Sequence, residues 1–169
     1  MSSHSAHPVQ VREKPLLLVD IDGVVSLWGF ASNTRPEGVW AQVDGIAHFL
    51  SARAATNLQS LQQSFELAWC SGWEDRANDH LPHLIGVGPL PHLTFGPGST
   101  AGHWKLDAID AYAGEHRSLA WVDDDFNDAC HAWAARRAAP TLLQESDPAI
   151  GLDDGVADQL RLWAEAPDG

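Results

Sequence analysis

The chain contains three short and almost uninterrupted apolar runs, at Leu16 to Val19, Phe65 to Cys70 and Leu119 to Val122. Because the runs lack a regular polar alternation, each predicts a strand that is buried on both faces, as in a parallel sheet. Weaker runs at His92 to Phe95 and Thr141 to Leu143 are two further strand candidates. The pattern therefore predicts a parallel sheet at the centre of the fold.

Segments with helical spacing of apolar residues lie between and after these runs. The expected helices follow Ser51, run from Trp73 to Ile85 and from Lys105 to Tyr112, follow Phe126, and run from Gly155 to Ala166. Ser51 is the expected N-cap of the first helix, and Pro140 ends the fourth. Strands that alternate with helices predict an α/β fold, a three-layer Rossmann-like, doubly wound sheet.

The region from residue 26 to residue 50 departs from this alternation. Two strand-like runs, GVWAQV and IAHFL, flank Asp44-Gly45, which is a strong signal for a two-residue hairpin turn. We expect a small β-hairpin flap after the first strand and no large cap domain, because residues 72–104 are too few to form one. The prediction is a single domain at residues 15–167, preceded by a flexible N-terminal tail at residues 1–14.

The composition narrows the choice of partners. The net charge of −13 disfavours sequence-independent binding of nucleic acid by this chain alone, although it is compatible with a small phosphorylated substrate held by a metal. No apolar stretch approaches the roughly 20 residues that span a bilayer, so we expect no membrane association. Cys70 and Cys130 predict reduced, buried thiols and a cytoplasmic protein.

Polar residues of a particular kind follow the apolar runs. Asp20 and Asp22 follow the first run, Ser71 and Gly72 follow the second, and Asp123, Asp124 and Asp125 follow the third, with Asp128 one turn later. In α/β sheets, ligands bind outside the carboxyl ends of the strands. Carboxylates that converge there repel one another, and all-oxygen ligation selects a hard cation, so the expected cofactor is Mg²⁺.

The order of these groups resembles that of the haloacid dehalogenase (HAD) superfamily of phosphohydrolases. VDIDGVV resembles the first motif of that family, and Ser71 resembles the second. Lys105 resembles the third, a lone Lys at a helix start, and WVDDDFND resembles the fourth. The resemblance extends over roughly residues 15–145. Two longer stretches, FELAWCSGWEDRAN and LAWVDDD, resemble a small bacterial HAD group that includes phosphatase-like domains attached to RNA-repair proteins.

The resemblance implies a Mg²⁺-dependent phosphatase that works through an aspartyl-phosphate. Asp20 would be the nucleophile, and Asp22 the general acid and base. The metal would bind the Asp20 carboxylate, the Asp22 backbone carbonyl and the Asp124 carboxylate. The remaining implied site residues are Ser71, Gly72 and Lys105 around the phosphoryl group, with Asp123, Asp125 and Asp128 around the metal ligands.

Several alternatives stay open at this level. Any of Asp123, Asp124 and Asp125 could bind the metal directly, Ser71 could cap a helix, and Arg76 could replace Lys105. His103, Trp104 and Trp73 are candidate pocket residues. The substrate could be a nucleotide, a nucleic-acid end or another phosphoester, and the oligomeric state is undetermined. A non-catalytic phospho-acceptor and an inactive HAD-like binding module are the alternative functions.

Overall fold

The structure is a computed structural model that describes residues 12–97 and 101–166. Most of the expected N-terminal tail therefore lies outside the described residues. Four strands, β1 (Leu16–Val19), β5 (Glu66–Trp69), β6 (Leu119–Asp123) and β7 (Thr141–Glu145), form a sheet in the order β5-β1-β6-β7. All neighbouring strands run parallel, as the buried apolar runs predict. β1 lies at the centre, between β5 and β6.

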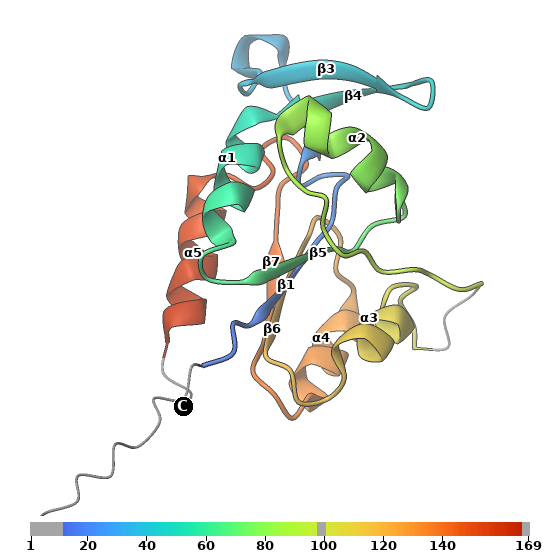
Figure 1. The fold of residues 1–169 in the computed structure, drawn as a ribbon, viewed down its shortest axis with the longest axis vertical. Coiled ribbons are helices and arrows are strands. Elements are labelled where there is room, and N and C mark those ends of the chain that lie inside the picture. Colours follow the sequence, from blue (N-terminus) through green and yellow to red (C-terminus); the bar gives the residue numbers. More distant parts are fainter. Residues whose placement is uncertain (1–11, 98–100, 167–169) are drawn as a thin grey trace, which may run out of the picture.

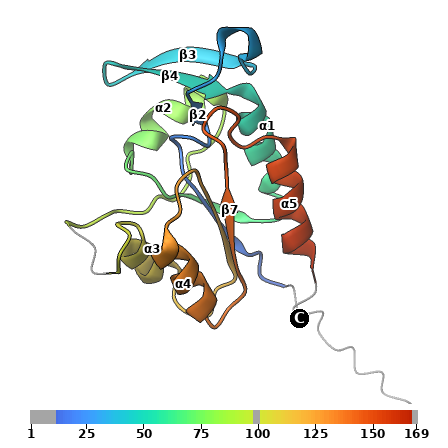
Figure 2. The same cartoon turned by 180° about the vertical axis from the view of Figure 1, so that it is seen from behind.

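Helices cover both faces of this sheet, so the predicted three-layer Rossmann-like fold is confirmed (Figure 1). Leu17 and Val19 point into one core, which α1 (Ala52–Leu61), α2 (Arg76–Ile85) and α5 (Asp154–Glu165) close. Leu16 and Leu18 point into the other core, against α3 (Leu106–Ala113) and α4 (Asp128–Arg136). This alternation follows from the period of two along a strand. The rear view shows α3 and α4 together on one side and α1 and α5 on the other (Figure 2).

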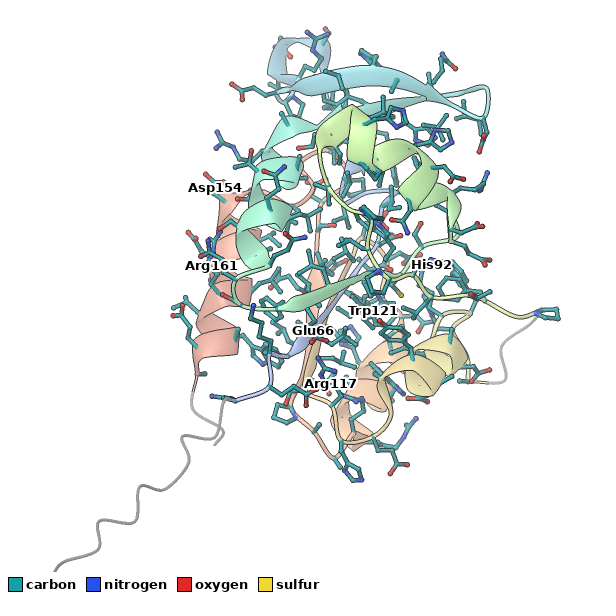
Figure 3. All side chains as sticks on the ribbon, in the orientation of Figure 1. Glu66, His92, Arg117, Trp121, Asp154 and Arg161 are labelled. Carbon is teal, nitrogen blue, oxygen red and sulfur yellow. The ribbon has the colours of Figure 1, made fainter. Side chains whose placement is uncertain are left out.

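Large aromatic side chains fill much of the second core. Trp121 of β6 is fully buried, and its ring lies 6.1 Å from the ring of Trp133 on α4 and 4.8 Å from that of Phe126. Figure 3 shows Trp121 in the interior between the sheet and these helices. The prediction that Trp121 and Trp133 belong to the core is confirmed.

The flap is a sheet of three strands, one more than the expected hairpin. β3 (Gly38–Val43) and β4 (Ile46–Ser51) pair antiparallel, and the short strand β2 (Ser26–Leu27) adds to β4 on its other side. A short 3-10 helix, η1 (Ser32–Thr34), joins β2 to β3. Asp44 and Gly45 have φ values of 50° and 81°, which is the left-handed pair that a type I′ hairpin turn requires. Within the described residues, this flap is the only addition to the three layers, and no large cap is present.

Two expected elements differ in the structure. The run at His92 to Phe95 is not a strand, since only His92 makes an isolated bridge, to Trp69, beside β5. Pro91 precedes it and Pro97 follows it, and proline cannot donate to a sheet ladder. The second helix begins at Arg76 rather than Trp73, because residues 72–75 form turns in which Glu74 has a φ of 50°.

The first, third and fifth helices begin and end close to their expected positions, whereas α4 ends at Arg136, before the expected stop at Pro140, because Arg137 is extended. Ser51 accepts a hydrogen bond from the Ala54 N–H at 3.0 Å, so the predicted N-cap is confirmed. Cys70 and Cys130 are both free and buried, as expected. Among the described residues, none of the helices combines the length and the apolar character needed to cross a membrane.

Candidate active site

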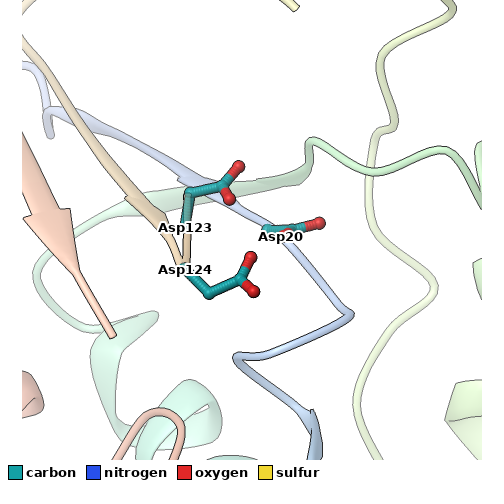
Figure 4. Close-up of side chains that lie close together, drawn as sticks. All are labelled: Asp20, Asp123 and Asp124. Atoms are coloured by element: carbon teal, nitrogen blue, oxygen red, sulfur yellow. The ribbon is translucent and has the colours of Figure 1, made fainter. Parts of the chain in front are cut away.

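The acidic residues meet at the carboxyl ends of the two central strands. Asp20 follows β1, Asp123 is the last residue of β6, and Asp124 comes next. The pairing of Val19 with Val122 brings these ends together, and the Asp20 N–H donates to the Val122 carbonyl at 3.1 Å. One carboxylate oxygen from each of Asp20, Asp123 and Asp124 lies within 4.8 Å of the others. Figure 4 shows the three carboxylates directed toward one small volume.

Lys105 lies buried among these acids, at the residue that precedes α3. Its Nζ donates to Asp123 Oδ2 at 2.6 Å and to the Cys70 carbonyl at 2.9 Å, and it lies 3.2 Å from Asp20 Oδ1. These three oxygens match the three N–H donors of an ammonium group. Lys105 therefore holds Asp20 and Asp123 in place. To contact a phosphoryl group as well, its ammonium group would have to give up one of these three contacts.

Asp123 and Asp124 have different surroundings, which the sequence alone could not distinguish. Both oxygens of Asp123 have partners, because Oδ2 accepts from Lys105 and Oδ1 accepts from the Asp125 N–H at 3.1 Å. Asp124 is half-buried against Gly23, whose φ is +83°. A Cβ at Gly23 would overlap the Asp124 carboxylate, so only glycine allows this approach. The position of Asp124 therefore depends on Gly23, which belongs to the first motif, VDIDGVV.

The electrostatics of the cluster indicate a surplus of negative charge. Burial raises the pKa of Asp20 well above its usual value, against the opposing effect of Lys105. Burial would lower the pKa of Lys105, but Asp20 and other acidic neighbours raise it above its ordinary value. These two directions conflict, since a protonated Asp20 would not attract Lys105, and the 3.2 Å contact favours the ionised pair. Burial, with the hydrogen bond and charge of Asp123, raises the pKa of Asp124 to about 6.

The donor set of this cluster fits Mg²⁺. Three carboxylates face a single ammonium group, and every candidate ligand atom is an oxygen, which a hard divalent cation prefers. Asp20 and Asp124 would hold the ion, with Asp123 beside them in contact with Lys105. The Asp22 backbone carbonyl as a further ligand stays a prediction.

The Asp22 side chain lies outside this cluster and contacts the flap side of the site. Its Oδ2 accepts a hydrogen bond from the Trp73 indole N–H at 3.1 Å, and its Oδ1 lies 3.8 Å from Nδ1 of His48 on β4. His48 in turn shares a 2.8 Å hydrogen bond with the Ser26 hydroxyl, and its ring packs edge-on against Trp73. Asp22 is thus oriented separately from the buried acids, and its side chain is about half exposed, at 49%.

Two of the expected phosphate-binding residues, Ser71 and Gly72, line the same cavity as the acids. Ser71 is buried, and its hydroxyl accepts a hydrogen bond from the Trp73 N–H at 3.2 Å, within the turn that precedes α2. Ser71 is therefore not the N-cap of a helix, since α2 begins at Arg76 after Asp75. Any phosphate contact would come from the amides and hydroxyl of this turn rather than from a helix end.

A cavity of about 290 Å³ joins these groups. It is lined by Asp20, Asp22, Trp28, Ser71, Gly72, His103, Trp104, Lys105, Asp123, Asp124 and Asp125. The pocket positions expected for His103 and Trp104 are thus observed, whereas Trp73, the third candidate, is not part of the lining. Asp128, the first residue of α4, is exposed and is not part of the lining. Arg76 forms an ion pair with Asp44 in the flap turn at 2.8 Å and does not line the cavity.

Two residues of the site were missed at the sequence level. Trp28 lines the cavity from the segment after β2, and His48 reaches Asp22 from β4. Neither belongs to a motif, and the contact of His48 with Asp22 joins residues that are distant in sequence. Two features of the sequence could have identified His48. It is a polar residue within an apolar run, IAHFL, and this run belongs to the expected hairpin that follows the first motif.

Among the solved structures that resemble this chain, two are of the same domain. The HAD domain of the effector protein Lem4 from Legionella pneumophila has a TM-score of 0.61 at 12% identity, covering 90% of this chain and 96% of that one. An inactive mutant of the same domain also has a TM-score of 0.61 at 12% identity, covering 91% and 96%. A protein from Vibrio cholerae, named as a "putative 3-deoxy-D-manno-octulosonate 8-phosphate phosphatase", has a TM-score of 0.45 at 15% identity, covering 92% of this chain and 88% of that one. No family model matches the chain, and no curated protein matches it in sequence.

Proposed function

Because the chain has the fold of a HAD domain, we propose that it is a Mg²⁺-dependent phosphomonoesterase that forms an aspartyl-phosphate on Asp20. The observation that carries the proposal is the convergence of Asp20, Asp123 and Asp124 around Lys105, with Asp22 in the same cavity. A polar turn without function would not bury two carboxylates and an ammonium group together.

In the first half-reaction, an Asp20 carboxylate oxygen attacks phosphorus, and the bond from phosphorus to the ester oxygen breaks. Asp22 gives its proton to the departing oxygen, so the product leaves as a neutral alcohol. Lys105 keeps Asp20 in a fixed orientation through the 3.2 Å contact, which limits the motion of the nucleophile. Ser71 and the turn after it hold the oxygens of the transferred group.

In the second half-reaction, the Asp22 carboxylate takes a proton from water as that water attacks the phosphorus of the aspartyl-phosphate. The bond from phosphorus to Asp20 breaks, inorganic phosphate leaves, and Asp22 is again protonated. A bound Mg²⁺ would offset the negative charge shared by Asp20, Asp124 and the phosphoryl group. The contacts of Asp22 with Trp73 and His48 keep the proton donor apart from the buried acids.

The substrate is a phosphomonoester that reaches an open site. Within the described residues no large cap covers the cavity, so we propose that the flap is the only cover over the leaving group. A nucleic-acid end stays a possible substrate class, although the net charge of −13 opposes a polyanion. Membrane association and a fixed oligomeric state form no part of the proposal.

The test is the hydrolysis of a generic aryl phosphate with and without Mg²⁺, in the parent and in Asp20→Asn. We expect turnover only with Mg²⁺, and a loss of about a thousandfold or more in Asp20→Asn. Asp22→Asn should lower the rate by about 10²- to 10⁴-fold and accumulate a phosphorylated protein. A parent that is phosphorylated but never hydrolyses the group would support a phospho-acceptor instead. A parent that only binds phosphate would support an inactive binding module.

A further inference from the structure

We propose that the aromatic groove of the flap binds the base of a free nucleoside monophosphate, whose nucleoside is the leaving group. The aromatic groove is the cavity lined by Trp28, Phe30, Trp40, Phe49 and His48. The inference rests on the proposed function, because it takes Asp22 as the proton donor to the leaving oxygen.

The groove is adjacent to the acidic cavity and has a volume of about 540 Å³. Asp22 and Trp28 line both cavities. A phosphoryl group at Asp20 must place its ester oxygen at Asp22 in order to be protonated there. The group attached to that oxygen then extends past Trp28 into the groove, which is large enough for a sugar and a base.

The walls of the groove suit a planar and uncharged ring. The ring of Phe49 lies 5.3 Å from that of Trp40 and 5.0 Å from that of Phe30, which forms an aromatic cluster on β3, β4 and the segment after β2. Trp40 is 59% exposed and Trp28 is 49% exposed, although exposed tryptophan is costly without a partner. Such side chains are stacking platforms for bases.

Charge and polarity restrict the occupant further. Among the described residues, neither Lys nor Arg lines the groove, and the Arg35 guanidinium lies 6.0 Å from the centre of the Phe49 ring. The groove lining itself therefore offers a second phosphate no cationic partner. His48 and the Ser26 hydroxyl offer hydrogen bonds at the end near Asp22, where a sugar would lie. The net charge of −13 opposes a polynucleotide, which favours a free nucleotide over the phosphorylated end of a nucleic acid.

The first experiment compares two esters that differ only in the base, adenosine 5′-monophosphate and ribose 5-phosphate, in the presence of Mg²⁺. We expect kcat/KM to be about tenfold or more higher for the nucleotide, which is the scale of one base stacked on an aromatic ring. Trp40→Ala should lower kcat/KM much more for the nucleotide than for ribose 5-phosphate and so remove most of this preference, whereas Trp40→Phe should retain much of it. Val39→Ala is the matched control, because Val39 is an exposed neighbour that lines a different cavity, next to α1 and α2.

The outcomes separate this inference from the proposed function. Equal kcat/KM values for the two esters, or an equal loss for both in Trp40→Ala, would overturn the groove and leave the phosphatase standing. Faster hydrolysis of a 5′-phosphorylated oligoadenylate than of the free nucleotide would overturn the choice of a free nucleotide.

If neither ester is hydrolysed, adenosine binding still decides the question of the groove. Chemical-shift changes in an NMR titration with adenosine should be confined to the groove and should weaken in Trp40→Ala but not in Val39→Ala. The absence of binding, or the same binding in both variants, would overturn the inference.

Discussion

The indole N–H of Trp73 donates a hydrogen bond to Oδ2 of Asp22 at 3.1 Å, across 51 residues of sequence. Trp73 is buried, so its ring is fixed, whereas the Asp22 side chain is 49% exposed. The hydrogen bond therefore orients an exposed carboxylate from a buried ring. Trp73 is a positioning residue in this account, and Asp22 carries the proton.

Removing this hydrogen bond while keeping an aromatic ring should slow the reaction more than it weakens binding. A hydrogen bond to a charged group contributes ~1.5–3 kcal/mol, so Trp73→Phe should lower kcat by roughly 10- to 100-fold with a smaller change in KM. Steady-state kinetics on an aryl phosphate measure both. Trp163→Phe is the control, because Trp163 stacks on Phe65 away from the site and should leave kcat unchanged. A rise in KM alone in Trp73→Phe would contradict the positioning role.

Replacing Lys105 should destabilise the fold, because two buried carboxylates would lose their ammonium partner. Breaking a buried ion pair on one side costs ~3–5 kcal/mol, so the free energy of unfolding of Lys105→Met should fall by about that amount without Mg²⁺. Urea unfolding with and without Mg²⁺ measures this, and Mg²⁺ should recover part of the loss. Lys14→Met is the control, since Lys14 is exposed. Equal stability of the two variants would show that Lys105 does not compensate the acids.

Gly23→Ala should displace Asp124, because the added Cβ would overlap the Asp124 carboxylate. We expect Mg²⁺ affinity to fall by about tenfold or more, as for the loss of a supporting contact in a metal site. Gly45→Ala is the matched control, since Gly45 has a similar φ of +81° but no atom within 4 Å of an added Cβ. Calorimetric titration with Mg²⁺ measures both variants. If Mg²⁺ affinity fell equally in Gly23→Ala and Gly45→Ala, the loss would come from backbone strain and not from the displacement of Asp124.

The stability of the metal-free protein should depend on pH through Asp124. Its pKa rises from 3.8 to about 6 in the fold, so the folded state holds this proton more tightly than the unfolded state. The stabilisation from the protonated group is therefore fully present below pH 3.8 and is lost as the pH rises through about 6. Mg²⁺ competes with the proton, so its stabilising effect should be larger at pH 7.5 than at pH 5. Unfolding curves of the parent and Asp124→Asn test this, and a larger Mg²⁺ effect at pH 5 would contradict it.

The sheet and its acidic edge were predictable because each depends on local sequence. Runs such as Leu16 to Val19 have no polar face, which leaves burial on both sides as the only stable solution. Because the strands are parallel, their carboxyl ends lie at one edge of the sheet, which brings Asp20 close to the acids at the end of β6. The hairpin turn at Asp44 and Gly45 was also predictable, since its backbone needs residues that tolerate positive φ.

The roles of neighbouring acids and the flap contacts were not predictable in the same way. Asp123 and Asp124 are alike in sequence, and their different contacts in space distinguish them, with Lys105 and the Asp125 N–H on Asp123 and with Gly23 against Asp124. His48 meets Asp22 because of the angle at which the flap packs on the site, which no local pattern encodes. Trp73 was expected in a helix and lies in a turn, because Glu74 adopts a positive φ that its sequence does not favour.

The central claim is that Asp20 accepts a phosphoryl group beside a Mg²⁺ ion. A crystal structure of the protein with Mg²⁺ and beryllium trifluoride tests it most directly, since this anion mimics a phosphoryl group on a carboxylate. We predict beryllium bonded to an Asp20 oxygen, with Mg²⁺ held by Asp20 and Asp124 and with Ser71 in contact with fluorine. An unmodified Asp20 with no ion between it and Asp124, in crystals that hold both reagents, would contradict the account.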